Sequence, residues 1–339
     1  MKWRSHGANP DKLYEQFNIP MPKRIIDFST NTNVLQSRVY NLDIMNMVSN
    51  YPDDESRELK EVISNNLDID KNEILVTNGS NEAIYMITSL YDDVVILQPT
   101  YSEYERAVKA SNNNYSYIKS IDELKSGNLL ILCNPNNPTG NYIERRELEE
   151  IIFRCKSLNM DVVIDEAYVD FLNVTHELID LKKSNNVYLL RSLTKSYHLS
   201  GARLGYVISS KDKISILKSK QPTWSVNAVA QAVGILSLSD KDHLQKTKDY
   251  YSSETPRVIS ALIDLGYKIL PTKVHYFLLE VSNDESFIRY LLKKGVIVRH
   301  TRNFPFLDGK YVRICVREQE QNDKLIRLLK EYKNENTSY

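Results

Sequence analysis

Seven short runs of apolar residues recur between residues 73 and 209. Most of them are rich in Val, Ile and Leu and alternate little with polar residues, which is typical of strands covered on both faces. They lie at residues 73–77, 93–98, 115–119, 128–133, 161–166, 186–192 and 203–209. We therefore predict seven strands within one buried sheet.

Helical periodicity fills several of the intervals between these runs. In residues 81–91, Ala83 and Ile87 fall on one stripe of a helix, and residues 145–159 show a similar pattern. Strands that alternate with helices predict an α/β fold in which the sheet is mostly parallel. The pattern thus indicates a large α/β domain over residues 41–240.

The pattern changes after about residue 240. A long helical segment at 243–266 leads into shorter apolar stretches, and a charged helix begins at Gln319. The shorter stretches lie at 267–271, 274–281, 296–300 and 311–317, with a helical one at 284–295. This mixture predicts a smaller α+β domain over residues 241–339, and we expect residues 1–40 to pack with it.

Composition excludes several classes of function. The 339 residues contain 44 Lys and Arg against 44 Asp and Glu, so no overall basic charge attracts nucleic acid or an anionic membrane. The three cysteines lack the spacing of a zinc site or a disulfide framework, and we expect neither; a reducing cytoplasm is the expected location. We expect no signal peptide, because the first residues lack an apolar core, and no membrane span, because no apolar run approaches about 20 residues.

Two loops that follow predicted strands carry polar residues suited to a ligand. In open α/β sheets, ligands bind at the carboxyl ends of the strands. The prolines of residues 132–140 make a rigid turn that could hold the Asn137 amide, although a plain turn explains them equally well. In residues 162–171, Asp165 and Glu166 end a buried strand, where an acid needs a partner. A nucleotide-bound magnesium is excluded because the chain has no phosphate-binding P-loop motif. The other interpretation is that Asp165 pairs with a cationic ring nitrogen of a ligand and that Tyr168 reaches the same ligand.

Two further loops suit a phosphate and an aldehyde. Gly79 and Ser80 stand at the start of a predicted helix, which favours phosphate binding, although Ser80 could equally cap the helix. Ser192 and Lys195 follow another strand, and Arg203 lies eight residues beyond the lysine. Lysine forms Schiff bases with aldehydes, and arginine and serine side chains together can bind a phosphate group. Together these features point to pyridoxal 5'-phosphate, which combines an aldehyde, a phosphate and a basic ring nitrogen.

The chain resembles the fold-type I pyridoxal-phosphate enzymes of the class I/II aminotransferase group. The motifs that carry the resemblance read NPNNPTG, DEAY and SLTKSYHLSGARLGY. It is most similar to the branch of threonine-phosphate decarboxylases and histidinol-phosphate aminotransferases, through HGAN, IIDFSTNTN, WSVNAVA and VIVRHTRNFPFLDGKYVRICVR. The resemblance covers nearly the whole chain and implies a large domain with a mostly parallel seven-stranded sheet plus a small α+β domain.

The resemblance also implies roles for particular residues. Lys195 would hold the cofactor aldehyde and move protons, Asp165 would keep the ring nitrogen protonated, and Tyr168 would bind the ring's phenolic oxygen. The predicted cofactor-binding residues are Tyr51, Gly79, Ser80, Asn81, Tyr101, Asn137, Asp165, Tyr168, Ser192, Lys195 and Arg203. Because the family is dimeric with shared active sites, Tyr51 is expected to reach the cofactor phosphate of a partner subunit.

Four residues are predicted to bind the substrate. Arg313 would hold its carboxylate, and Arg299 would lie near its phosphate or carboxylate with Asn33 and His6. The family's Asn-Pro-Leu-Gly becomes NVLQ here, which puts the substrate in question but leaves the cofactor residues intact. The predicted function is decarboxylation of O-phospho-L-threonine or a similar substrate. The alternatives are an aminotransferase of the histidinol-phosphate type and a non-catalytic regulator that binds the cofactor.

Overall fold

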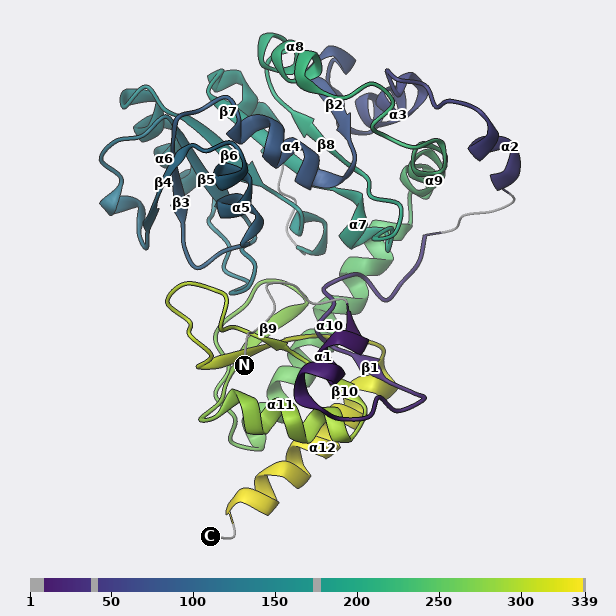
Figure 1. Ribbon diagram of the computed structural model, residues 1–339, viewed down its shortest axis with the longest axis vertical. Coiled ribbons are helices and arrows are strands. Elements are labelled where there is room, and N and C mark those ends of the chain that lie inside the picture. The colour runs from purple at the N-terminus through teal and green to yellow at the C-terminus, as the bar shows by residue number, and fades with distance from the viewer. Residues whose placement is uncertain (1–8, 38–41, 173–177, 338–339) are drawn as a thin grey trace.

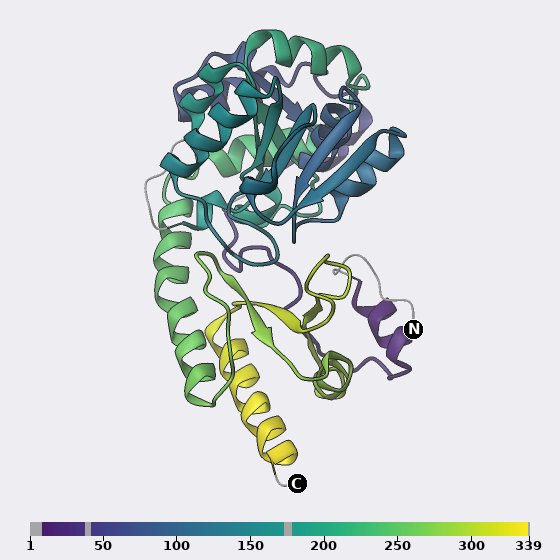
Figure 2. The same ribbon diagram turned by 90° about the vertical axis from the view of Figure 1, so that its left-hand side faces the viewer.

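The computed structural model describes residues 9–37, 42–172 and 178–337. The chain forms an upper and a lower part, called the large part and the small part below (Figure 1). The large part holds the main sheet, and the small part holds β9 together with α1 and α12 from near the two ends of the chain (Figure 1). Helix α10 (His243–Asp264) runs from the large part down along the small one (Figure 2).

The large part is built on a seven-stranded sheet with the order β2-β8-β7-β6-β5-β3-β4. Strands β3 to β7 run parallel to one another, whereas β8 pairs antiparallel with β2 and β7. The bounds are β2 Ile74–Thr77, β3 Asp93–Leu97, β4 Asn114–Ile118, β5 Leu129–Cys133, β6 Asp161–Asp165, β7 Val187–Ser192 and β8 Gly205–Ile208. All seven predicted strands are present, and the prediction of a mostly parallel α/β sheet is confirmed.

Helices cover both faces of this sheet, which explains why its strands are apolar without alternation. In β5, Leu129 and Ile131 join the hydrophobic core on one face, and Leu130 and Leu132 join the core on the other. Helices α4 (Gly79–Thr88), α5 (Glu103–Ala110) and α8 (Lys211–Lys220) pack into the first core. Helices α3 (Arg57–Leu67), α6 (Arg145–Ser157) and α9 (Ala228–Ser239) pack into the second.

The remaining helical elements of the large part are short. They are α2 (Ile44–Ser49), α7 (Leu193–Ser196) and the 3-10 turns η1 (Lys71–Glu73), η2 (Ile121–Glu123), η3 (Val169–Phe171) and η4 (Ile179–Ser184). None of the helices within the described ranges is both long and apolar enough to cross a membrane.

The small part contains a three-stranded antiparallel sheet with the order β11-β12-β9. Its strands are β9 (Tyr276–Glu280), β11 (Arg299–His300) and β12 (Tyr311–Cys315). Helices α11 (Asp284–Lys293) and α12 (Gln319–Thr337) belong to this part, and α12 packs against α10. The structure thus has helices and antiparallel strands where the sequence predicts an α+β unit, and the boundary near residue 240 stays a prediction.

The N-terminal segment joins the small part through a pair of strands. Strand β1 (Ile26–Asp27) pairs in parallel with β10 (Val296–Ile297). Helix α1 (Pro10–Phe17) is held by the Tyr14 hydroxyl, which donates to the Leu292 carbonyl oxygen at 3.0 Å. Beyond β1, residues 29–33 continue toward Lys195, where the Asn33 amide donates to the Lys195 carbonyl oxygen at 2.9 Å.

Two of the apolar stretches in the small part do not each form one continuous strand. The stretch at 267–271 contributes one bridge, between Ile269 and Leu279. The stretch at 296–300 is divided into β10 and β11, because β10 pairs with β1 and β11 pairs with β12. An apolar run shows that a segment is buried, but it does not show which strand it pairs with.

Candidate active site

A cavity of about 440 Å³ lies at the carboxyl ends of the central strands. Its walls come from the large part, from the small part and from residues 29–32 of the N-terminal segment. The predicted loops after β2, β5, β6 and β7 each contribute at least one residue to it, as expected for strand ends that share one edge of a sheet. This convergence makes the cavity the candidate active site.

Lys195 lies in α7, directly after β7, with its amine in the cavity. Its Nζ donates to Asn31 Oδ1 at 3.1 Å. Burial, followed by the positive charges of Arg313 and Arg203, lowers the pKa of Lys195 to about 8. A larger fraction of this amine is therefore neutral near pH 7 than for an exposed lysine, and only a neutral amine attacks a carbonyl group.

Asp165 ends β6 and is 3% exposed. Its carboxylate accepts hydrogen bonds from Tyr104 Oη at 2.8 Å and from the Ala167 amide at 3.0 Å. Burial raises the pKa of Asp165, and these hydrogen bonds together with Lys195 act in the opposite direction. A buried carboxylate held in this way suits a cationic partner in the cavity.

Glu166, the next residue, has a different environment. It is 1% exposed and forms an ion pair with Arg191, whose Nε lies 2.8 Å from Glu166 Oε2. Successive residues of an extended chain point to opposite faces, so Asp165 reaches the cavity while Glu166 binds Arg191. The two neighbouring acids therefore have separate partners, and Asp165 is the one available to a ligand.

Two polar side chains near Lys195 are oriented by their neighbours. Asn31 Nδ2 donates to Tyr168 Oη, and Arg313 Nη1 donates to Asn137 Oδ1. Burial raises the pKa of Tyr168 well above its ordinary value, so the hydroxyl keeps its hydrogen. Because Asn137 Oδ1 already accepts a hydrogen bond from Arg313, the Asn137 side chain faces the cavity as a donor, through its Nδ2 hydrogens. Tyr168 and Asn137 can both donate hydrogen bonds to one oxygen atom of a ligand.

The predicted phosphate-binding residues gather around the first turn of α4. Ser80, Asn81, Ser192 and Arg203 line the cavity. The N-cap of α4 is Asn78, so Ser80 is not the cap and its hydroxyl remains for another role. A helix N-terminus, two hydroxyl groups and a guanidinium together form a site for an anion.

Backbone geometry brings Arg203 to this turn. Gly79 has a φ of 71°, and a Cβ on it would lie 2.9 Å from Arg203 Nη2. Arg203 itself has a φ of 58° and donates from Nη1 to the Ser200 carbonyl oxygen at 3.0 Å. Tyr101, which also lines the cavity, donates to Asn81 Oδ1 at 3.3 Å.

Two buried arginines from the small part face the same cavity. Arg299 on β11 and Arg313 on β12 are directly opposite each other in the antiparallel register, and each is 5% exposed. Burial, followed by the charge of Arg313, lowers the pKa of Arg299 to about 9. Like charges opposite each other destabilise a sheet, so the pair favours an anion bound between or beside them.

Two predicted side chains within the described residues lie outside the cavity. Asn33 is fully buried, and its side chain donates to Thr247 Oγ1 and to the Ser196 carbonyl oxygen, so it supports the fold beneath Lys195. Tyr51 is 79% exposed and stacks on Trp224. His6 lies outside the described residues.

The structure adds residues that sequence reasoning missed. Asn31 contacts both Lys195 and Tyr168, and Tyr104 holds Asp165 from α5. Phe304 lines the cavity from the loop after β11. The segment IIDFSTNTN does signal a family motif, but the choice between its two asparagines depends on which one faces the lysine.

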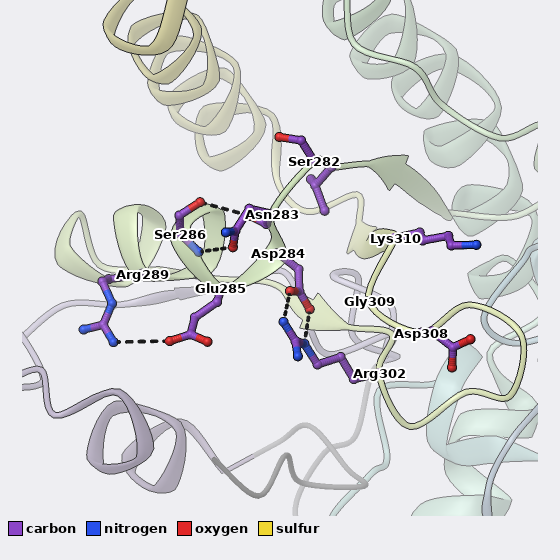
Figure 3. Close-up of a pocket in the computed structure, with 11 residues that line it drawn as sticks. Ser282, Asn283, Asp284, Glu285, Ser286, Arg289, Arg302, Asp308, Gly309 and Lys310 are labelled. Atoms are coloured by element: carbon purple, nitrogen blue, oxygen red, sulfur yellow. Dashed lines mark hydrogen bonds and ion pairs between the residues drawn. The ribbon is translucent and has the colours of Figure 1, made fainter.

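A separate cavity of about 480 Å³ lies in the small part, beside the start of α11 (Figure 3). Arg302 forms two hydrogen bonds with the Asp284 carboxylate there, at 2.8 and 2.5 Å. Arg289 pairs with Glu285 at 3.7 Å (Figure 3). These charged side chains bind one another and do not converge on a common point, which favours the first cavity as the active site.

Comparison with known proteins agrees with the geometry. The family model for aminotransferase class I and II matches residues 27–329. A threonine-phosphate decarboxylase from Salmonella typhimurium is 32% identical, with 96% of each chain covered. A histidinol-phosphate aminotransferase from Methanococcus aeolicus is 30% identical, with 97% of this chain and 95% of that one covered.

A solved structure is similar over most of the chain. The histidinol-phosphate aminotransferase from Clostridium acetobutylicum superposes with a TM-score of 0.85 at 26% identity. The similarity covers 92% of this chain and 100% of that one.

Proposed function

The chain belongs to the aminotransferase class I and II family, and from this premise we propose that it uses pyridoxal 5'-phosphate to act on a phosphorylated amino acid. The cofactor is supported by three groups of residues around the cavity: an amine of lowered pKa, a buried carboxylate and a cluster of anion-binding groups. These match the cofactor's aldehyde, ring nitrogen and phosphate.

The predicted roles of the cavity residues fit this cofactor. Lys195 Nζ would hold the aldehyde, and the Asp165 carboxylate would keep the ring nitrogen protonated, which offsets the cost of burying that carboxylate. Tyr168 and Asn137 would donate to the phenolic oxygen. The ring would lie beside Tyr101, and the first turn of α4 would bind the phosphate together with Ser192 and Arg203.

Chemistry at the substrate follows from the same residues. When bound, the cofactor supplies an electron sink for the charge that develops on the substrate's α-carbon. Arg313 would bind the carboxylate of the substrate and so orient the substrate. Lys195 Nζ, with its lowered pKa, can accept a proton near neutral pH and return one to the α-carbon.

The observation that carries the choice of substrate is the pair Arg299 and Arg313. Among the described residues that line the cavity, four are cationic and only Asp165 is acidic. The cofactor phosphate accounts for Arg203, and one substrate carboxylate accounts for Arg313. Arg299 therefore favours a second anionic group on the substrate, as in O-phospho-L-threonine.

Decarboxylation of O-phospho-L-threonine or a close analogue is our leading proposal, since a relative of this name covers 96% of the chain. The second candidate is an aminotransferase of the histidinol-phosphate type, which the relative and the solved structure of that name favour. Both substrates carry a phosphate. A non-catalytic regulator is disfavoured, because Lys195, Asp165 and Arg313 are all present in the cavity.

One experiment separates the candidates. The protein loaded with pyridoxal phosphate is incubated with O-phospho-L-threonine and no keto acid, and released carbon dioxide is measured, with Lys195→Ala as the inactive control. Release supports the decarboxylase, and its absence rules out this substrate. Formation of glutamate from 2-oxoglutarate and histidinol phosphate would support the aminotransferase instead.

We also propose a homodimer in which Tyr51 reaches the partner's active site. Tyr51 is 79% exposed, and α2 beside it exposes Met45 at 76% and Val48 at 60%. Such an apolar surface is unusual for a monomer. Light scattering that gives the mass of a single chain for the fully active protein would contradict this proposal.

A further inference from the structure

We infer that Asn31 is a positioning residue: its side-chain amide holds the Lys195 amine on one side and turns the Tyr168 hydroxyl hydrogen toward the cavity on the other. The inference rests on the proposed function in taking Lys195 as the reacting amine. It concerns a residue that lies two positions before NVLQ, where the chain departs from the family's Asn-Pro-Leu-Gly.

The orientation of the Asn31 amide follows from its two partners. A protonated lysine amine can only donate hydrogen bonds, so the atom that faces Lys195 Nζ must be Oδ1, at 3.1 Å. Nδ2 is then directed at Tyr168 Oη, which accepts from it. Since that hydroxyl oxygen is the acceptor in this bond, its own hydrogen remains for a ligand in the cavity.

The backbone around Asn31 is fixed by side chains of the small part. Three of them each donate to one backbone carbonyl oxygen of residues 29–32. The pairs are Arg313 with Ser29 at 2.6 Å, His275 with Asn31 at 3.1 Å and Arg317 with Thr32 at 3.2 Å. A side chain on such a fixed backbone loses little further conformational entropy when it forms hydrogen bonds with its two partners.

His275 defines the direction of one of these bonds. It is fully buried, it stacks on Phe171 with ring centroids 3.7 Å apart, and burial lowers its pKa to about 3. The imidazole is therefore neutral at physiological pH, with its hydrogen on Nε2, because the Asn31 carbonyl oxygen can only accept. Asn31 is thus held by a group whose charge does not change over the range in which Lys195 titrates.

The arrangement makes a directional prediction for Lys195. The charged and titratable groups that act most strongly on its amine are Asp165 from β6, Arg203 from the loop before β8, and Arg313 and Cys315 from β12. Cys133 from β5 and His275 before β9 interact with it more weakly. Asn31 adds a neutral acceptor, which stabilises the ammonium form less than a carboxylate does. Asn31→Asp therefore raises the pKa of Lys195, and Asn31→Leu, which removes the acceptor, lowers it.

The test uses the cofactor-free protein. Lys195 is acylated competitively over a range of pH, and its labelling is quantified by mass spectrometry of the peptide. We expect Asn31→Asp to react about fivefold more slowly than the wild type at pH 8, which corresponds to a pKa raised from about 8 by about one unit. Asn31→Leu should react at least as fast as the wild type. Identical Lys195 titrations in all three proteins would overturn the inference.

A matched control separates positioning from damage to the segment. Asn33→Ser alters the neighbouring asparagine, whose side chain bonds to Thr247 and the Ser196 carbonyl oxygen but not to Lys195 Nζ. It should leave the Lys195 titration unchanged. If the Lys195 pKa shifts as much in Asn33→Ser as in the Asn31 variants, the cause is displacement of the whole segment, and the inference is wrong. In the protein loaded with pyridoxal phosphate, the visible absorbance of the cofactor also changes with pH. The pH of that change should be higher in Asn31→Asp than in the wild type, and lower in Asn31→Leu.

The outcome is independent of the substrate assay. If Lys195 titrates as expected while the wild type releases no carbon dioxide from O-phospho-L-threonine, the proposed substrate is wrong and the role of Asn31 stands. If carbon dioxide is released but Asn31→Asp leaves the Lys195 titration unmoved, the function stands and this inference is wrong.

Discussion

Gly205 lies directly against the backbone of Ser80. A Cβ atom on Gly205 would come 2.7 Å from the Ser80 nitrogen and 2.8 Å from the Arg191 carbonyl oxygen. Both contacts are with backbone, which cannot move aside as a flexible side chain would. The first strand residue of β8 must therefore be glycine for the first turn of α4 to lie where it does.

Gly205→Ala should consequently weaken both the fold and the proposed phosphate site. We expect a loss of about 1–3 kcal/mol in the free energy of unfolding, as for other overpacked positions, and about tenfold weaker binding of pyridoxal phosphate. Urea unfolding and a cofactor titration measure the two effects. Gly201→Ala is the stability control, because nothing lies within 4 Å of a Cβ there. Equal stability of the two variants would contradict this account.

Lys195→Ala should abolish the covalent adduct with the cofactor. In the wild type, borohydride reduction is expected to fix the cofactor to the peptide that contains Lys195. Peptide mass spectrometry of the reduced protein checks this, with Lys213→Ala as the control, since that lysine pairs with Asp161 away from the cavity. An adduct that persists on another lysine of Lys195→Ala would refute the assignment.

Capture of the cofactor should depend on pH through the Lys195 amine. Its pKa is lowered to about 8, and the neutral amine is the reactive form. Below pH 8 the rate of adduct formation should therefore fall about tenfold per pH unit, and above it the rate should level off. Stopped-flow absorbance after mixing cofactor-free protein with pyridoxal phosphate measures the profile. A rate that does not vary between pH 6 and 9 would exclude this amine as the limiting group.

Arg299→Gln should discriminate between phosphorylated and unphosphorylated substrates. If Arg299 binds the substrate phosphate, kcat/KM for the phosphorylated substrate should fall about 100-fold, as for the loss of a buried charged hydrogen bond. The value for an unphosphorylated analogue should change about threefold at most, because that substrate makes no such contact. Arg146→Gln, at a fully solvated position of α6, serves as the control. Equal losses for both substrates would place Arg299 elsewhere in the reaction.

His275 should make stability depend on pH. Its folded-state pKa is about 3, against 6.5 as the ordinary value, so the unfolded chain binds a proton between these values and the folded chain does not. The contribution of this neutral histidine is therefore complete above about pH 6.5 and is lost as the pH falls toward 3, at about 1.4 kcal/mol per pH unit. Urea unfolding at pH 7, 6 and 5 should show a smaller decline for His275→Gln, which keeps a donor for the Asn31 carbonyl oxygen. Parallel declines would mean that His275 is protonated in the folded state.

The sequence predicts the large sheet well because its strands are buried on both faces. Each of the seven apolar runs corresponds to a strand, and the loops at their carboxyl ends bring Asp165, Lys195, Asn137 and Arg203 to one cavity. That convergence follows from parallel strands alone, since their ends share an edge. The same reasoning cannot place the N-terminal segment, because the contacts that join it to the rest of the protein are distant in the sequence.

Asn31 and Asn33 illustrate this limit. They are two residues apart in the same polar stretch, and nothing in the local pattern distinguishes them. In the structure Asn31 faces Lys195, whereas Asn33 turns into the packing between the Lys195 helix and α10. The choice is made by His275, just before β9, and by side chains of β12 and α10, which lie more than 200 residues further along the chain.

Pairing of β1 with β10 has a consequence for the order in which the protein is made. Tyr14 and its acceptor Leu292 are 278 residues apart, so the N-terminal segment leaves the ribosome long before its partners are synthesised. The lysine helix can fold earlier, with the large sheet. Asn31, however, acquires its fixed backbone only after His275 and Arg313 have emerged. A nascent chain therefore displays the Lys195 amine before that amine is oriented, and β12 completes the proposed active site only after the large sheet has been translated.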